Sequence, residues 1–523
     1  MISSILHRSQ RSNVFHLGGS SASVCLFFLC LLFPAFSYSQ QRETTYKAET
    51  FGSFSTGKNT PFWMLYHNWG KVPLDANNFY FSGAVFHKQQ INKAWSFQAG
   101  LDMAGSSPHA FGTVWVQQAY GVVDWKVFQL KIGSKEDYVS LLDENLSSGD
   151  FSNSNNARPI PEVKLSLNKY LLVPYTKGNM FIKGDFAVGK YLDGKWQEDI
   201  ARPQFRQYLM DVLSHHKSLY FRFGNIEEKH KLQFTFGFNH YAQWGGDIYR
   251  RKKSPEGVPY YEISRQPHGL DDFLRVMIAR EGSSSSSGAD MLYVAGSQTG
   301  SYLFKFDYKL NPSDFLHLYY HHFFEDGSGM GPESIQDMLL GLQYHSTEKR
   351  LLSNAVFEYV YTKKQTGPIH FNLDMDDAHD NIRNKGNGND NYYNNVDYLQ
   401  GPSHYGRTMG TPLFLSPEYN RDGYLNFKSN RIIAFHLGLE GYFHPTFSYR
   451  LLATTGQTWG RYYVPFVDVR DGFASNVDLI YANPRLKDLD FKLSIGFNTG
   501  KYFDEDAFGA GITITKRGII SKK

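Results

Sequence analysis

Apolar and polar residues alternate along many short segments of this chain. The clearest segment, Lys231 to Asp247, reads KLQFTFGFNHYAQWGGD. In an extended strand, successive side chains point to opposite faces. The leucine and three phenylalanines therefore share one face, and the glutamine, threonine, glycine and asparagine share the other. The segment ends in an aromatic and polar cluster before a Gly-Gly break, which is where a binding site could sit.

The same two-faced pattern recurs from end to end and predicts roughly eighteen strands. Short turns such as 311–314 and 347–349 alternate with long loops, except near 225–231 and 461–487. The expected strands include 46–55, 79–88, 95–103, 113–123, 126–133, 162–167, 181–189, 204–213, 219–224, 302–308, 337–344, 489–498 and 508–515.

Opposite the apolar rows stand charged residues and glycines. Leu489 to Phe497, for example, places five apolar side chains against aspartate, lysine, serine and glycine. A soluble β-sandwich would also alternate, but it seldom pairs so aromatic a face with so charged a face. The pattern favours an all-β fold: a transmembrane antiparallel β-barrel of about eighteen strands, with lipid outside and a polar lumen inside.

One segment departs from this pattern. Residues 271–280 carry apolar side chains at helical spacing after an acidic start, which predicts a small amphipathic helix. Within a barrel it would be a plug or lid, at one rim or in the lumen. Packing on the outside of a loop is an equal alternative.

Residues 1–39 are typical of a secretory signal peptide, with Arg8 and Arg11 before a short apolar centre. The barrel would then span 40–523, with long loops at 137–161, 242–300 and 362–428. Both cysteines of the chain, Cys25 and Cys30, lie inside the signal, so the exported protein would have no disulfide.

Composition narrows the class of protein. Aromatic residues make up 16% of the chain, and the mean hydropathy of −0.43 excludes an ordinary helical membrane protein. The formal charge of +4 falls to about +2 without Arg8 and Arg11, which gives no indication of nucleic-acid binding. We expect a protein of the cell outer membrane, in contact with its lipid and monomeric.

Four segments in order resemble the Wzi-type capsule assembly family. They are Pro61-Phe62-Trp63 with Asn68 and Gly70, the run NNARPIP at 155–161, the run HYAQWGG at 240–246, and YYNN at 392–395 with YGRTMGTP at 405–412. The resemblance spans most of the exported chain. It implies an outer-membrane barrel of about eighteen strands with a helical element, which binds capsular polysaccharide as a surface lectin.

Sugar binding combines aromatic faces, which stack on sugar rings, with polar groups, which bond hydroxyls and carboxylates. Most candidates have a structural alternative: an interfacial aromatic for Trp244, a lumenal salt bridge for Arg158, and internal loop packing for the tyrosines and Arg407. The candidate polysaccharide-binding residues are Arg158, His240, Trp244, Asp247, Tyr392, Tyr393, Tyr405 and Arg407.

No catalytic motif and no cofactor site is evident, so we expect a binding protein rather than an enzyme. The adjacent pairs His215-His216 and His321-His322 point to opposite strand faces and cannot share a metal. Asp374, Asp376, Asp377 and Asp380 could hold calcium, but they lack calcium-loop spacing and favour a solvated loop. A diffusion porin and an outer-membrane hydrolase remain the alternatives.

Overall fold

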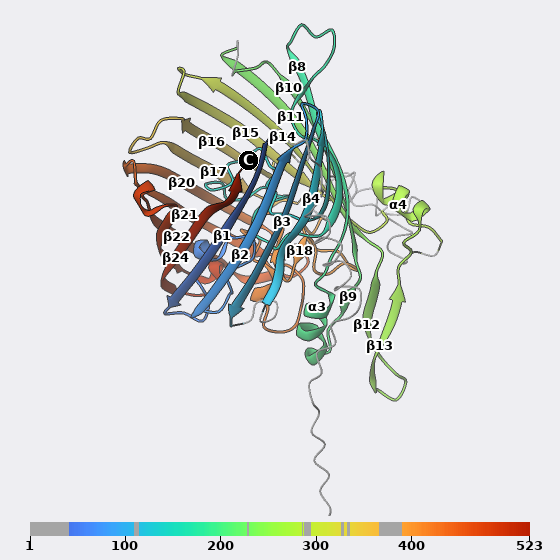
Figure 1. The fold of residues 1–523 in the computed structure, drawn as a ribbon. Helices are drawn as coiled ribbons and strands as arrows, with labels where there is room; N and C mark the ends of the chain where they lie inside the picture. Colours follow the sequence, from blue (N-terminus) through green and yellow to red (C-terminus); the bar gives the residue numbers. More distant parts are fainter. Residues whose placement is uncertain are drawn as a thin grey trace, which may run out of the picture.

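The computed structural model describes residues 41–108, 114–226, 230–284, 286, 294–325, 329–331, 335–365 and 390–522. Within these ranges, nineteen strands form one antiparallel sheet, and one of them, β7 (Leu171–Leu172), pairs only with β8. The other eighteen form a ring that closes where β1 pairs with β24 (Figure 1). The predicted barrel of about eighteen strands is confirmed.

Each barrel strand pairs with the next one along the chain. The eighteen strands are β1 (Gln41–Ser55), β2 (Asn78–Gln90), β3 (Trp95–Ser107), β4 (Val114–Trp125), β5 (Phe128–Ser134), β6 (Glu162–Leu167), β8 (Met180–Lys190), β10 (Leu213–Phe223), β11 (Leu232–Trp244), β14 (Ser297–Lys309), β15 (Asp314–Phe324), β16 (Met338–Ser346), β17 (Asn354–Tyr361), β20 (Ile432–His444), β21 (Phe447–Gly460), β22 (Pro465–Ala482), β23 (Leu489–Thr499) and β24 (Ala507–Lys522).

The remaining elements lie in the connections. A three-stranded sheet contains β9 (Tyr208–Met210), β12 (Asp247–Lys253) and β13 (Pro259–Arg265), and a small hairpin contains β18 (Ser403–His404) and β19 (Arg407–Thr408). The helices are α2 (Phe62–Leu65), α3 (Gly194–Ala201), α4 (Leu270–Met277) and the 3-10 turns η1 (Arg202–Gln204), η3 (Pro417–Tyr419), η4 (Pro484–Leu486) and η5 (Lys501–Phe503). None of the helices in the described ranges is long and apolar enough to cross a membrane.

Two expected strands were wrong in detail. The stretch 204–213 does not enter the barrel: left-handed backbone at Phe205 and Asp211 breaks it, and its centre, β9, pairs with β12 instead. The stretch 219–224 is the second half of β10. With one strand removed here, the short connection 224–231 between β10 and β11 fits the alternation, but the break near 461–487 remains, because only residues 461–464 join β21 to β22.

The long connections gather at one end of the barrel, here called the long-loop rim, and the short turns at the other. The C-terminus lies at the short-turn end, away from α3 and the β12–β13 hairpin (Figure 1). The long loops run over 135–161, 245–296 and 362–431 between strands, close to the ranges expected from the sequence.

Apolar side chains cover the outside of the barrel wall. Phe81, Leu165, Leu342, Phe357 and Ile512 are between 47% and 57% exposed, although they sit in the middle of paired strands. Because alternate side chains point inward, their neighbours along each strand, such as Gln343 and Val356, are buried in the interior of the barrel. The outward apolar row predicted from the sequence is confirmed, and it is the surface that a lipid bilayer requires.

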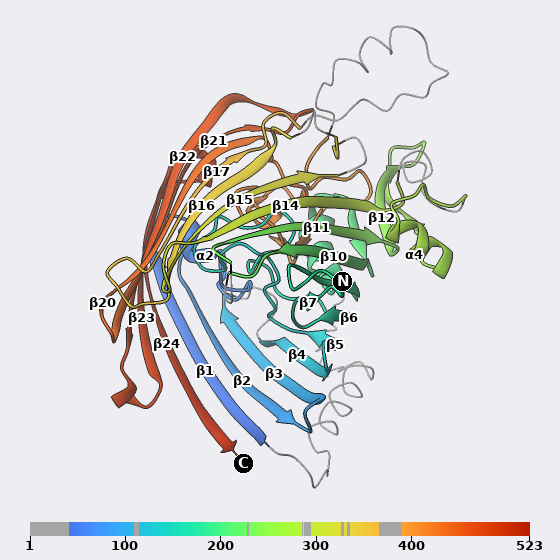
Figure 2. The ribbon, with the colours of Figure 1, turned by 90° about the horizontal axis from the view of Figure 1, so that it is seen from above.

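Three inward-folded segments, 56–77, 135–161 and 390–431, form a plug inside the ring (Figure 2). They contribute a buried apolar core of their own, which includes Phe62, Trp63, Phe151, Tyr393 and Phe414, each at most 1% exposed. The lumen expected to be lined by polar groups is therefore largely filled by the chain itself.

Hydrogen bonds tie the plug to the wall. The Trp63 indole N–H donates to Thr454 on β21 at 2.9 Å, and the Ser148 backbone N–H donates to Glu358 on β17 at 2.7 Å. Gly438 on β20 allows the closest approach, since a Cβ there would lie 2.4 Å from the carbonyl oxygen of Leu146. The plug comes from loops, whereas the predicted helix, α4, packs outside the barrel.

Candidate functional site

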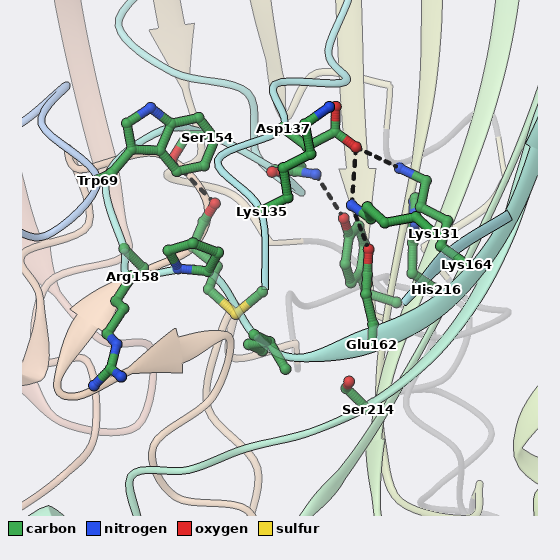
Figure 3. A pocket seen from close by; sticks show the side chains of 16 residues that line it. Trp69, Lys131, Lys135, Asp137, Ser154, Arg158, Glu162, Lys164, Ser214 and His216 are labelled. Atoms are coloured by element: carbon green, nitrogen blue, oxygen red, sulfur yellow. Dashed lines mark hydrogen bonds and ion pairs between the residues drawn. The ribbon is translucent and has the colours of Figure 1, made fainter. Parts of the chain in front are cut away.

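A pocket inside the barrel is the strongest candidate site (Figure 3). It lies between the 135–161 segment and the wall formed by β5, β6, β10 and β11, with about 650 Å³ of empty volume counting its open mouth. The lining residues are Trp69, Lys131, Lys135, Asp137, Asn153, Ser154, Ala157, Arg158, Pro159, Ile160, Glu162, Lys164, Ser214, His216, Tyr241 and Met409.

An ion network occupies one side of this lumenal pocket. Lys131 Nζ lies 2.9 Å from both Asp137 Oδ2 and Glu162 Oε1, and Lys164 Nζ lies 3.5 Å from the same Asp137 oxygen. The two lysines are paired across the adjacent strands β5 and β6, Glu162 begins β6, and Asp137 lies at the start of the plug segment between these strands. The network therefore fixes that segment against the wall.

Lys135 adds a further positive charge. Its ammonium group lies 5.3 Å from the ring centre of Tyr120, and no ion-pair partner is present in the described part of the chain. Burial lowers the pKa of Lys135. The positive charges of Lys131 and Lys164 lower it further, whereas the negative charge of Asp137 raises it. An anionic ligand group beside Lys135 would offset both effects.

The lining has more permanent cations than carboxylates. It contains three lysines and Arg158 against Asp137 and Glu162. A concave site with an excess of one charge sign in a poorly hydrated surrounding attracts the opposite sign. The pocket is thus suited to a ligand that carries both hydroxyls and a negative charge.

Arg158, predicted from the NNARPIP run, stands at the edge of the pocket and is 9% exposed. Its Nη2 donates to the carbonyl of Val116 at 2.5 Å, and its guanidinium lies 4.9 Å from the ring centre of Tyr405. The two prolines that follow it hold the chain out of the ladder until β6 begins. The structure thus brings together two predicted residues that are 247 positions apart.

Tyr405 is held in place by neighbouring loops. Its backbone N–H donates to Asp193 Oδ2 at 3.0 Å, and its hydroxyl donates to the carbonyl of Leu192 at 3.1 Å. Tyr405 and Gly406 both adopt left-handed backbone in the turn between β18 and β19. Burial raises the pKa of Asp193 to about 6, against the hydrogen bonds from Tyr405 and Gln197.

Trp69 and Lys135 belong to the pocket but were not among the predicted site residues. Trp69 lies in the run Asn68-Trp69-Gly70. Its backbone N–H donates to the backbone carbonyl of Asn155 at 2.7 Å. The sequence signal for Trp69 was its place in a motif, and Lys135 carried no signal at all. Both reach the pocket only because the plug segments fold against one another.

His240, Trp244 and Asp247 do not line the lumenal pocket. Since they follow the outward row of β11, His240 and Trp244 point away from the lumen; α4 covers Trp244, and His240 lies beside Gln298, whose amide donates to the carbonyl of Val276 on α4. His240 Nε2 lies 2.6 Å from Gln298 Oε1, while Trp244 packs 5.6 Å from Phe273. Asp247 begins β12 beyond the barrel wall.

Tyr392, Tyr393 and Arg407 are buried inside the plug and have at most 2% of their surface exposed. The Tyr392 hydroxyl donates to Asp337 at 3.0 Å. The Arg407 guanidinium forms two hydrogen bonds of 2.8 Å to Glu418. These side chains fold the long loop into the lumen, which is the structural alternative considered for them.

The histidine pairs behave as the strand period requires. His216 faces the lumen and lies 2.9 Å from Asp185, whereas His215 faces outward toward Phe273. Within the described residues, no group of three or more His, Cys, Asp or Glu side chains could hold a metal ion. The aspartates considered for calcium, at 374–380, and the expected signal peptide lie outside the described residues.

Comparison with known proteins supports the fold. No protein-family model and no curated protein sequence matches the chain. The structure is similar to that of Wzi from Escherichia coli, described as an outer-membrane protein involved in group 1 capsule assembly and a carbohydrate-binding β-barrel. The TM-score is 0.52 at 13% identity, with 90% of this chain and 83% of that chain covered. This chain folds as an outer-membrane β-barrel.

Two other solved structures give lower TM-scores. OccD1 (OprD) gives a TM-score of 0.45 at 7% identity over 93% of this chain and 98% of that chain. OccAB2 of Acinetobacter baumannii gives a TM-score of 0.46 at 8% identity, with 93% of this chain and 100% of that chain covered. Barrels of the outer membrane carry short turns toward the periplasm and longer loops toward the cell exterior. By that rule, we expect the long-loop rim of this protein to face outward from the cell.

Proposed function

We propose that this protein binds an anionic surface polysaccharide in the lumenal pocket and aids the assembly or retention of a capsule. The observation that carries the proposal is the excess of cations in a pocket that also presents the aromatic side chains of Trp69 and Tyr241. Acidic sugars need both: a charged partner for the carboxylate and flat apolar faces for the ring.

The arrangement gives each group a role. Lys135 and Arg158 would contact the acidic group of the sugar, and Trp69 would stack on its ring. Asn153, which donates to the Tyr241 hydroxyl at 2.8 Å, would offer its carbonyl oxygen to a sugar hydroxyl. The carbohydrate binding described for Wzi, which shares this fold, supports the same role.

A diffusion porin is the main alternative function. The plug argues against it, because buried aromatic side chains such as Trp63, Phe151 and Tyr393 occupy the lumen. A porin predicts a large steady conductance in planar lipid bilayers, and a plugged binding barrel predicts only small or rare openings. Large steady conductance of the intact protein would decide for the porin.

Binding is tested with purified protein in detergent and three polymers: hyaluronate and alginate, which contain uronic acids, and uncharged dextran. We expect the two acidic polymers to bind, with affinity falling as salt rises, and dextran to bind far more weakly. Lys135→Ala and Arg158→Ala should each weaken binding about tenfold, consistent with the loss of one charge-assisted contact. Lys349→Ala, in the short turn between β16 and β17, is the control and should bind as the wild type does.

Two outcomes would overturn the proposal. One is wild-type protein that binds neither the acidic polymers nor the capsule polymer of its own source. The other is acidic polymer that is shortened on incubation, which would point to the hydrolase alternative. In cells, deletion of the gene should leave the polymer made but shed into the medium.

A further inference from the structure

The outer wall of the barrel changes character where β10 and β11 approach the long-loop rim. Along β11 the outward row runs through Phe234, Phe236 and Phe238 and then reaches His240. Along β10 it runs from Leu219 to Lys217 and His215. Imidazole and ammonium groups on the outer wall are costly against hydrocarbon, so this part of the wall is not itself a lipid surface.

Helix α4 covers this polar patch of the wall. Phe273 packs 5.4 Å from His215 and 5.6 Å from Trp244, Val276 is 2% exposed, and Lys217 donates to the carbonyl of Met277. As a result His215 is fully buried and His240 is 6% exposed. Both ribbon views place the helix beside the outer wall rather than within the ring (Figures 1 and 2).

The helix has two neighbouring apolar sectors. At about 100° per residue, Phe273 and Val276 point to the wall, and Leu270, Leu274 and Ile278 form the next sector around the axis. The remaining sector is polar and carries Asp271 and Arg275, which form an ion pair of 2.9 Å. A helix lying on a protein in water needs only one apolar sector.

The second apolar sector is exposed. Leu270, Leu274 and Ile278 are 75%, 44% and 54% exposed, on a helix that packs against the outer wall at β10 and β11. We propose that α4 lies in the outer leaflet of the membrane, with these three side chains among the lipid chains and its polar sector in the headgroup region. It extends the lipid-facing surface over a part of the wall whose own outward side chains are polar.

Lipid is the occupant that fits, because the exposed sector continues an established lipid interface. An amphipathic helix with one apolar face buried at the headgroup boundary and polar groups toward water is the usual form of an interfacial helix. Here the wall of the barrel contributes the docking surface, through Phe273 and Val276, and fixes the depth of the helix.

Spin labels test the position of α4. Residues 41–523 contain no cysteine, so single labels can be attached in a full chain in which Cys25 and Cys30 are replaced by serine. Labels at Leu274→Cys and Ile278→Cys are compared in phospholipid vesicles with Leu342→Cys on the outer wall of the barrel and Val258→Cys in the β12–β13 turn. The readout is the collision rate with oxygen, which concentrates in lipid, relative to a water-soluble nickel chelate.

We expect the labels on α4 to resemble Leu342, with collisions dominated by oxygen, and Val258 to be dominated by nickel. Heat-modifiable migration on gels establishes that each variant is folded. Nickel-dominated collisions at both α4 positions in folded protein would overturn the proposal. So would dipolar broadening between α4 labels, because it would mean that a second copy of the chain covers the helix.

Discussion

The carboxylate of Glu358, on the lumenal face of β17, accepts a hydrogen bond from the backbone N–H of Ser148 at 2.7 Å. The same carboxylate accepts hydrogen bonds from the hydroxyls of Ser147 and Tyr319, at 2.7 and 2.6 Å. Glu358 is fully buried, so these donors are its main compensation for burial. One wall residue thus holds the centre of the 135–161 segment inside the barrel.

Replacement of this carboxylate should loosen the plug. Glu358→Ala leaves buried donors of Ser147, Ser148 and Tyr319 without an acceptor, at about 1–3 kcal/mol each. We expect a several-fold rise in the frequency of open-channel events in planar bilayers. Glu358→Gln, which keeps one acceptor oxygen, should give a frequency of openings between those of the wild type and Glu358→Ala. Glu348→Ala, in an exposed short turn, should leave the conductance unchanged, and an equal rise in that control would exclude a specific anchor.

The buried pair of Arg407 and Glu418 should stabilise the long plug loop. Removing one partner of a buried ion pair leaves an uncompensated charge and costs about 3–5 kcal/mol. We therefore expect Arg407→Ala to make the 390–431 segment sensitive to protease in folded barrels. The double variant Arg407→Met with Glu418→Leu should recover part of the resistance. No recovery would mean that shape rather than charge compensation decides the packing of this loop.

Asp193 should introduce a pH dependence of stability. Its folded pKa of about 6 lies above the ordinary value of 3.8, so the folded protein holds the proton more tightly than the unfolded chain. Ionisation of this buried carboxyl therefore lowers the free energy of unfolding. The loss is absent below pH 4, grows as pH rises from about 4 to 6, and is then complete at about 3 kcal/mol.

Thermal unfolding in detergent between pH 4 and 8 measures this effect. Asp193→Asn removes the titration and should flatten the decline in the unfolding midpoint over that window. Asp199→Asn, on the exposed side of the same helix α3, should keep the decline. A decline that is the same in Asp193→Asn and the wild type would show that other groups cause it.

The ring of Tyr405 should matter more than its hydroxyl for ligand binding, given the proposed function. The stacked guanidinium of Arg158 gains about 0.5–2 kcal/mol from the ring. Tyr405→Ala should therefore weaken hyaluronate binding roughly 2- to 30-fold by releasing Arg158, by the usual conversion of free energy to affinity. Tyr405→Phe should bind nearly as the wild type does. Isothermal titration calorimetry gives both affinities, and equal losses would contradict a role for the stacked ring.

The barrel itself was predictable because its signal is local. Alternation of period two along each strand determines which side chains face outward, as in the β11 row from Leu232 to Phe238. The same local pattern located the long loops and the amphipathic segment 271–280. It also required each adjacent histidine pair to face opposite ways, as His215 and His216 do.

The candidate site depended on the tertiary structure. Arg158 and Tyr405 were found from motifs, but Trp69 and Lys135 join them only through packing between segments far apart in the sequence. The strand period put His240 and Trp244 on the outer row, yet only the position of α4 shows that they are covered. Arg407 likewise bonds the carbonyl of Val72, 335 residues away.

The sequence by itself thus determined the fold class, the faces of the strands that it located correctly and the loops that would be long, because those properties follow from neighbouring residues. Only the tertiary structure decided that the segments 56–77, 135–161 and 390–431, rather than the predicted helix at 271–280, fill the lumen, and which charges meet in the pocket. The physical reason is that buried hydrogen bonds and ion pairs such as Ser148–Glu358 join positions whose spacing along the chain carries no periodic signal.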